Sequence, residues 1–325
     1  MGIASTIKLY HRWWKAWGTL PVSAWVRAAA LYRAGKFEEA ISSYESGLAR
    51  YSAHPAAISA HLDLAYCLFR AGRFDEALQT LKFIVGRTPL VREAHIRLAT
   101  VQMWLGQAIE AAWTMKRALQ LMRSDAELVG TFLAAVVENG GPRFLLNEAI
   151  EEAARLPENE VHPKLQVARA RLKILQNEPG QGRTELEALA IDANATRDAV
   201  LAYAEVLVED GKIAQARQHL RRLMNGASEH PRVLSLLAES YLKSGPFYNT
   251  EFAAQLATNA CQKTNWCSPR EMHVLAEAYL HDGDKISALL VASKAKEAGS
   301  KLLGAYREEK TLDKLIETLS TGTQA

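Results

Sequence analysis

The sequence is poor in proline and glycine, which interrupt helices, and in cysteine, which forms the disulfides of small secreted domains. It has 10 prolines, 19 glycines and 3 cysteines in 325 residues. Low proline and glycine contents favour long helical segments. Cys67, Cys261 and Cys267 form no CxxC pair, and an odd number with one cysteine inside a helical pattern is not typical of a disulfide framework. The cysteines are typical of small buried side chains in a reducing compartment.

Long apolar runs and a strong charge imbalance are also missing. The longest apolar stretch, around residues 128–137, is about half as long as the roughly 18–20 residues of a membrane-spanning helix. A net charge of +3 is too small for a nucleic-acid binder, which needs a concentrated basic face. The first residues lack the continuous apolar core of a secretory signal. We therefore expect a cytoplasmic protein that binds no nucleic acid.

An internal repeat organises most of the chain. Glycines recur every 34 to 38 residues in two series, each after an apolar segment: Gly35, Gly72 and Gly106, then Gly211, Gly245 and Gly283. This period predicts a unit of two helices and a turn. Around Gly72, the spacing of Leu64 and Leu68 predicts one buried helix face, and that of Ala77, Leu81 and Ile84 predicts the next. Such a hairpin cannot bury its apolar face alone, so copies must stack.

The pattern resembles the tetratricopeptide repeat (TPR). In the second copy the matching residues are Leu64, Ala65, Leu68, Gly72, Phe74, Ala77, Leu81, Ile84 and Pro89. The resemblance implies an all-α fold, a right-handed α-solenoid of about eight helix-turn-helix repeats over residues 22–302. Copies near residues 126–195 are degenerate. Residues 1–20 are expected to form a basic, aromatic amphipathic helix, residues 303–319 a C-terminal capping helix, and residues 320–325 a disordered tail.

In the TPR fold the first helices of successive repeats line a concave groove. At the positions where the resemblance implies groove residues, the first three repeats are aromatic or aliphatic: Trp25, Tyr32, Leu62, Tyr66, Phe69, Ile96, Met103 and Trp104. An apolar groove of this kind fits a partner's amphipathic helix or extended peptide. In the last three repeats these positions are mostly acidic and polar, with Glu205, Glu209, Glu239 and Glu277 among them. The alternative is that single aromatic residues pack between adjacent repeats.

Sequence motifs for catalysis are absent. The chain has no phosphate-binding loop, no nucleophile elbow and no HExxH zinc motif. His273, Glu277 and His281 share one face of a predicted helix, but the two histidines would lie ~12 Å apart, too far to bind one ion. We therefore expect no catalytic residues, no cofactor and no metal site.

The first seventeen residues contain three of the seven tryptophans and match no repeat. On a helix, apolar residues from Ile3 to Trp17 would share one face and basic residues the other. This pattern suits a cap on the first repeat, an anionic membrane surface or docking onto a partner. The predicted docking residues are Ile7, Tyr10, Trp13, Trp14, Trp17, Lys8, Arg12 and Lys15.

These features predict a non-catalytic scaffold or adaptor that binds a helix or peptide of one or more partner proteins in the N-terminal groove. One alternative is a peripheral assembly or secretion factor held at the cytoplasmic membrane face by the tryptophan-rich helix. Another is a regulatory TPR subunit of a separate enzyme.

Overall fold

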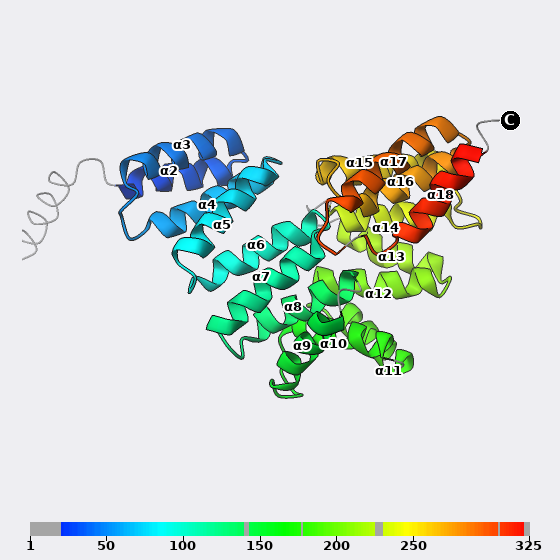
Figure 1. Ribbon diagram of the computed structural model, residues 1–325, viewed down its shortest axis with the longest axis horizontal. Helices are drawn as coiled ribbons and strands as arrows, with labels where there is room; N and C mark the ends of the chain where they lie inside the picture. The colour runs from blue at the N-terminus through cyan, green and yellow to red at the C-terminus, as the bar shows by residue number, and fades with distance from the viewer. Residues whose placement is uncertain (1–20, 140–142, 177, 225–229, 305, 322–325) are drawn as a thin grey trace, which may run out of the picture. The chain divides into compact units, whose positions relative to one another are not determined.

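Every regular element in the described part of the chain is an α-helix. The computed structural model describes residues 21–139, 143–176, 178–224, 230–304 and 306–321. Seventeen helices follow one another in this part of the chain (Figure 1), so the prediction of an all-α fold is confirmed. No described helix has the length and apolar character needed to cross a membrane.

The chain divides after Val101 into two compact units, which we call unit 1 and unit 2. Unit 1 contains α2 (Pro21–Arg33), α3 (Phe37–Arg50), α4 (Ala57–Arg70), α5 (Phe74–Arg87) and most of α6 (Arg92–Trp104). Unit 2 begins within α6 and continues with α7 (Ala108–Leu121), α8 (Ala126–Asn139), α9 (Arg143–Ala154), α10 (Pro163–Leu175), α11 (Pro179–Ile191), α12 (Arg197–Glu209), α13 (Ile213–Met224), α14 (Pro231–Leu242), α15 (Thr250–Lys263), α16 (Pro269–Asp282), α17 (Lys285–Ser300) and α18 (Glu309–Thr321).

The helical hairpin of α4 and α5 shows how the repeat pattern produces structure. Gly72 has a φ of 79°, and its backbone N–H bonds to the carbonyl of Phe69, which ends α4 in a left-handed turn. The predicted stripe is buried, with Leu64 6% and Leu81 1% exposed. The other repeating glycines also have positive φ: Gly35, Gly106, Gly211, Gly245 and Gly283.

The repeats that look degenerate in sequence are held by close backbone contacts. A Cβ atom on Gly130 of α8 would lie 2.6 Å from the backbone nitrogen of Leu165 in α10. On Gly182 of α11 it would lie 2.5 Å from the carbonyl oxygen of Ala170 in α10. Both distances are shorter than any normal van der Waals contact, so these helices pack together only because both positions are glycine.

The C-terminal helix begins later than the sequence pattern suggested. We expected a helix over residues 303–319, but α18 begins at Glu309, and Gly304 adopts a φ of 87° in the preceding segment. Within α18, Leu312 and Leu319 are buried, and the helix packs against α17. Residues 301–304 and 306–308 form a non-helical connection between these two helices.

Candidate functional site

A pair of tyrosines lies on the first helices of the two repeats in unit 1. The ring centroids of Tyr32 in α2 and Tyr66 in α4 are 5.3 Å apart, and Tyr66 is 41% exposed. Burial and a hydrogen bond to Tyr66 raise the pKa of Tyr32 to about 12, so this hydroxyl stays protonated at neutral pH. The two residues, which we call the tyrosine pair, present a partly exposed aromatic surface.

Fixed arginines border the tyrosine pair. The guanidinium carbon of Arg97 lies 5.7 Å from the centre of the Tyr66 ring. Arg97 donates to Glu93 at 2.6 Å and to the carbonyl of Leu62 at 2.8 Å, which holds its side chain in place. Arg70 follows Tyr66 by four residues on α4, and its guanidinium carbon lies 5.3 Å from the centre of the Phe37 ring. Such cation–π contacts orient the cations around an aromatic surface.

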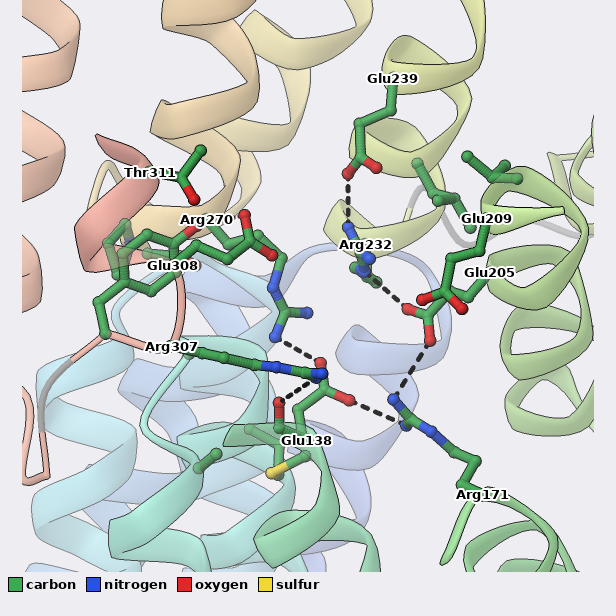
Figure 2. A pocket seen from close by; sticks show the side chains of 18 of the residues that line it. Glu138, Arg171, Glu205, Glu209, Arg232, Glu239, Arg270, Arg307, Glu308 and Thr311 are labelled. Atoms are coloured by element: carbon green, nitrogen blue, oxygen red, sulfur yellow. Dashed lines mark hydrogen bonds and ion pairs between the residues drawn. The ribbon is translucent and has the colours of Figure 1, made fainter. Parts of the chain in front are cut away.

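A cavity of about 370 Å³ lies in unit 2, lined by α8, α10, α12, α14, α16 and the segment before α18. We call it the charged pocket (Figure 2). Its lining includes five basic residues, Arg171, Arg232, Arg270, Arg307 and Lys310, and five acidic residues, Glu138, Glu205, Glu209, Glu239 and Glu308. The numbers of cations and carboxylates match, so the lining is close to electrically neutral.

Six of these side chains form one alternating network, drawn with dashed lines in Figure 2. It runs from Arg270 through Glu138, Arg171, Glu205 and Arg232 to Glu239. The donor–acceptor distances are 2.9 Å from Arg171 to Glu138, 3.2 Å from Arg171 to Glu205, 2.9 Å from Arg232 to Glu205 and 2.8 Å from Arg232 to Glu239. The network therefore connects the first helices of five successive repeats.

The six side chains of this network stay ionised although they are shielded from water, because their opposite charges neutralise one another. Burial alone would raise the pKa of Glu138, but Arg270 and Arg171 hold it well below its ordinary value. Burial alone would lower the pKa of Arg171, Arg232 and Arg270, but the neighbouring carboxylates raise it above the ordinary value of arginine. Each charge is thus paired, as buried charges in folded proteins normally are.

The segment between α17 and α18 closes one side of the charged pocket. The Tyr306 hydroxyl lies 3.2 Å from Nδ1 of His273, and Glu308 lies 3.5 Å from the same nitrogen. Arg307 donates to the backbone carbonyl of Glu138 at 3.3 Å, and the backbone N–H of Leu303 donates to Glu110 at 3.0 Å. The segment is therefore anchored to both α7–α8 and α16 of the same unit.

Comparisons with known proteins assign the repeat type. A tetratricopeptide repeat family model matches residues 26–90, and a second matches residues 198–222. The chain contains tetratricopeptide repeats. The resemblance predicted from the glycine and alanine pattern is thereby confirmed.

Solved structures share the TPR architecture. A TPR protein from Parabacteroides merdae ATCC 43184 is similar at a TM-score of 0.51, with 13% identity over 93% of this chain and 100% of that chain. The crystal structure of the APC/C hetero-tetramer Cut9–Hcn1 contains a chain similar at a TM-score of 0.67, with 11% identity over 92% of this chain and 63% of that chain. Identities this low show the fold alone. A search of curated proteins finds no match.

The structure places the eight predicted groove residues in different environments. Trp25, Leu62 and Ile96 are only 8%, 9% and 7% exposed, because neighbouring side chains cover the helix face on which they lie. These three contribute to packing and leave little area for a ligand. Of the other five, Tyr66 is exposed and the rest are half-buried: Tyr32, Phe69, Met103 and Trp104.

The predicted groove residues also divide between the two units. Tyr32, Tyr66 and Phe69 belong to unit 1, whereas Met103 and Trp104 belong to unit 2. Met103 lines the charged pocket. The indole N–H of Trp104 donates to the carbonyl of Lys263 at 2.9 Å, and its ring centroid lies 4.6 Å from that of His230. The predicted docking residues between Ile7 and Trp17 lie outside the described residues.

His273 and His281, which were expected on one face of a helix, contact different residues. His273 is 3% exposed and contacts Tyr306 and Glu308, whereas Nδ1 of His281 lies 3.2 Å from the hydroxyl of Tyr248. Burial raises the pKa of Glu277, which lies between them on α16. Among the described residues, no three His, Cys, Asp or Glu side chains are grouped so that they could hold a metal ion.

The sequence analysis placed three carboxylates of the charged pocket, Glu205, Glu209 and Glu239, on a groove surface. It missed Glu138, Glu308 and the arginines. Glu205 and Glu239 were expected on an acidic groove surface, yet Arg171 and Arg232 neutralise them. Arg232 and Arg270 each follow the proline that begins a helix, in the dipeptides at 231–232 and 269–270. This recurring Pro-Arg pair was the available signal that the first turns of these helices carry arginines.

Proposed function

We propose that this TPR protein is a non-catalytic adaptor and that unit 1 binds a helix or peptide of a partner protein at the tyrosine pair. The exposed, arginine-bordered ring of Tyr66 carries the proposal. Tyrosine and arginine are enriched in the energetically dominant positions of protein interfaces. The partner segment would present an apolar side chain to the rings and a carboxylate to Arg70, since Arg97 is already paired with Glu93.

Two further observations support this choice. Stacked helical repeats create extended surfaces that such proteins generally use for binding rather than for catalysis. In unit 2 the charged pocket already satisfies its arginines and glutamates internally, so a peptide would have to compete with existing ion pairs. One structurally similar chain belongs to the APC/C hetero-tetramer Cut9–Hcn1, an assembly of the kind proposed here.

Site-specific photocross-linking tests the proposal. A benzophenone amino acid replaces Tyr66 in the full chain, which is then irradiated in a lysate of its source cells. We expect a discrete cross-linked protein, identified by mass spectrometry. The matched probe replaces Phe83, which is 49% exposed on the second helix α5 and should not give that product. Identical products at both positions, or none at position 66, would contradict the proposal.

The same experiment separates the alternative roles. If the cross-linked partner is an enzyme, the chain acts as a regulatory subunit. The alternative role at an anionic membrane surface depends on residues 1–20, which lie outside the described residues. Sedimentation with anionic phospholipid vesicles compares the full chain with a chain that lacks residues 1–20, and equal pelleting would argue against membrane attachment.

A further inference from the structure

A second cavity in unit 2, of about 400 Å³, lies between the α12–α13 turn and the loop that joins α14 to α15. Its lining combines apolar side chains, such as Ile213, Pro246 and Phe247, with the basic side chains of Lys212, Arg217 and Lys243. No carboxylate is among its lining residues in the described part of the chain. In this respect it differs from the charged pocket, where cations and carboxylates are equal in number.

Arg217 of α13 is the key residue of this cavity. It is 5% exposed, and its guanidinium carbon lies 4.3 Å from the centre of the Tyr241 ring and 5.0 Å from that of Phe247. Its Nε donates to the hydroxyl of Ser240 at 3.1 Å, and Nη2 donates to the Ser240 carbonyl. Two rings and two hydrogen bonds fix the orientation of the guanidinium, while Nη1 has no hydrogen-bond acceptor among the described residues.

The charge of Arg217 lacks the compensation that other shielded arginines of unit 2 receive. Arg171, Arg232 and Arg270 are more exposed, with 18% to 24% of the side-chain surface accessible, and each pairs with a glutamate. Arg217 has less of its surface exposed, 5%, yet no described carboxylate pairs with it. Burial lowers the pKa of Arg217, whereas nearby carboxylates raise that of the other three. A buried charge without a counter-ion is costly, so a counter-ion bound at this place would stabilise the fold.

The rest of the lining specifies the kind of anion. Lys212 and Lys243 are exposed, so they can attract an anion without being needed for folding. The apolar side chains around them would lie against hydrocarbon. A planar guanidinium held in one orientation suits a carboxylate or phosphate, to which arginine can donate two parallel hydrogen bonds.

We propose that this cavity binds a small amphiphile whose carboxylate or phosphate head pairs with Arg217 and whose apolar body lies against Ile213, Pro246 and Phe247. Lys212 and Lys243 strengthen the attraction from the rim. The site is separate from the tyrosine pair, which lies in unit 1, so it goes beyond the adaptor role and can be tested without the protein partner.

Calorimetric titration of the full chain with octanoate, octyl phosphate and the neutral octanamide tests this proposal. We expect at least one of the anions to bind saturably at one site and octanamide to bind at least tenfold more weakly. The comparison of octanoate with octyl phosphate identifies the preferred head group. Arg217→Gln should weaken binding of the preferred anion about tenfold or more, because a hydrogen bond between two charged groups is lost.

A second variant keeps the test decisive if Arg217→Gln fails to fold. The double variant Lys212→Gln/Lys243→Gln changes only exposed residues and should weaken binding about two- to tenfold. Lys82→Gln/Lys285→Gln removes the same charge from exposed positions that do not line the cavity and should bind like the unmodified chain. The proposal is overturned if neither anion binds saturably, if octanamide binds as tightly as the preferred anion, or if the two double variants bind alike.

Discussion

Glu138 of α8 and Arg270 of α16 form an ion pair that joins helices far apart in the sequence of unit 2. Glu138 also accepts a hydrogen bond from Arg171 at 2.9 Å, so one carboxylate neutralises two arginines from two other helices. Its side chain is 14% exposed. The stability of unit 2 should therefore depend on this single charge.

Replacing Glu138 by glutamine keeps the shape of the side chain but leaves two shielded arginines without their shared counter-ion. Breaking a buried ion pair on one side is strongly destabilising. We expect the free energy of unfolding to fall by about 2–4 kcal/mol, measured by urea denaturation followed by circular dichroism. Glu209→Gln is the control, since Glu209 lines the same pocket but is exposed, and it should change stability by less than about 0.5 kcal/mol. Equal effects of the two substitutions would show that the network does not stabilise the fold.

His230, at the N-terminus of α14, makes stability depend on pH. Burial, together with Arg197 and Arg232, lowers the pKa of His230 to about 3 from its ordinary 6.5. The native state therefore keeps this histidine neutral, whereas the unfolded chain binds a proton as the pH falls below about 6.5. Its contribution to stability is complete above pH 6.5 and is lost progressively between pH 6.5 and 3.

Between pH 7 and pH 5, protonation of His230 in the unfolded chain should lower the free energy of unfolding by about 2 kcal/mol. In His230→Asn the side-chain oxygen can replace Nδ1 of His230, which accepts from the backbone N–H of Arg232, and asparagine cannot titrate in this range. Urea denaturation at both pH values should show a smaller loss of stability in the variant by about that amount. The same pH dependence in both proteins would mean that His230 can be protonated in the native state.

Local patterns in the sequence were sufficient to predict the repeat fold. The buried stripe of Leu64 and Leu81 and the positive φ of Gly72 follow from the spacing of residues within one hairpin. The period fixes which face of a helix is apolar. It does not determine whether the next repeat covers that face, which is why Trp25 and Leu62, expected in an open groove, are buried.

The candidate sites could not be predicted in the same way, because they are formed by contacts between segments that are distant in the sequence. The pairing of Glu138 with Arg270 depends on how several repeats stack, and no short-range pattern contains that geometry. Tyr306 was expected on a capping helix, whereas it lies in a non-helical segment against His273. Tyr32 and Tyr66, by contrast, lie on α2 and α4, the first helices of adjacent repeats, and their role in partner binding stays a prediction.

Gly182 of α11 should not accept a side chain without loss of stability, although it lies in one of the repeats with a degenerate sequence. A Cβ atom would lie 2.5 Å from the carbonyl of Ala170 and 2.7 Å from the side chain of Ile174, so α10 and α11 would have to move apart. We expect Gly182→Ala to lower the free energy of unfolding by about 1–3 kcal/mol, as overpacking of a tight contact does. Gly180→Ala, in the first turn of the same helix with open space around it, should be neutral or stabilising by up to about 1 kcal/mol. Thermal melting of the two variants tests this, and equal destabilisation would contradict the close packing of α10 and α11.

Trp25 and Tyr66 should respond differently to truncation, although both were expected in the same groove. Trp25 is 8% exposed within the core of unit 1, and its ring lies 5.6 Å from that of His54, so Trp25→Ala should destabilise unit 1 by about 3 kcal/mol or more. Tyr66 is 41% exposed, so Tyr66→Ala should cost about 1 kcal/mol or less. Urea denaturation of the full chain measures both effects. If Tyr66→Ala destabilises as strongly as Trp25→Ala, the tyrosine pair belongs to the core, and its proposed role in partner binding is wrong.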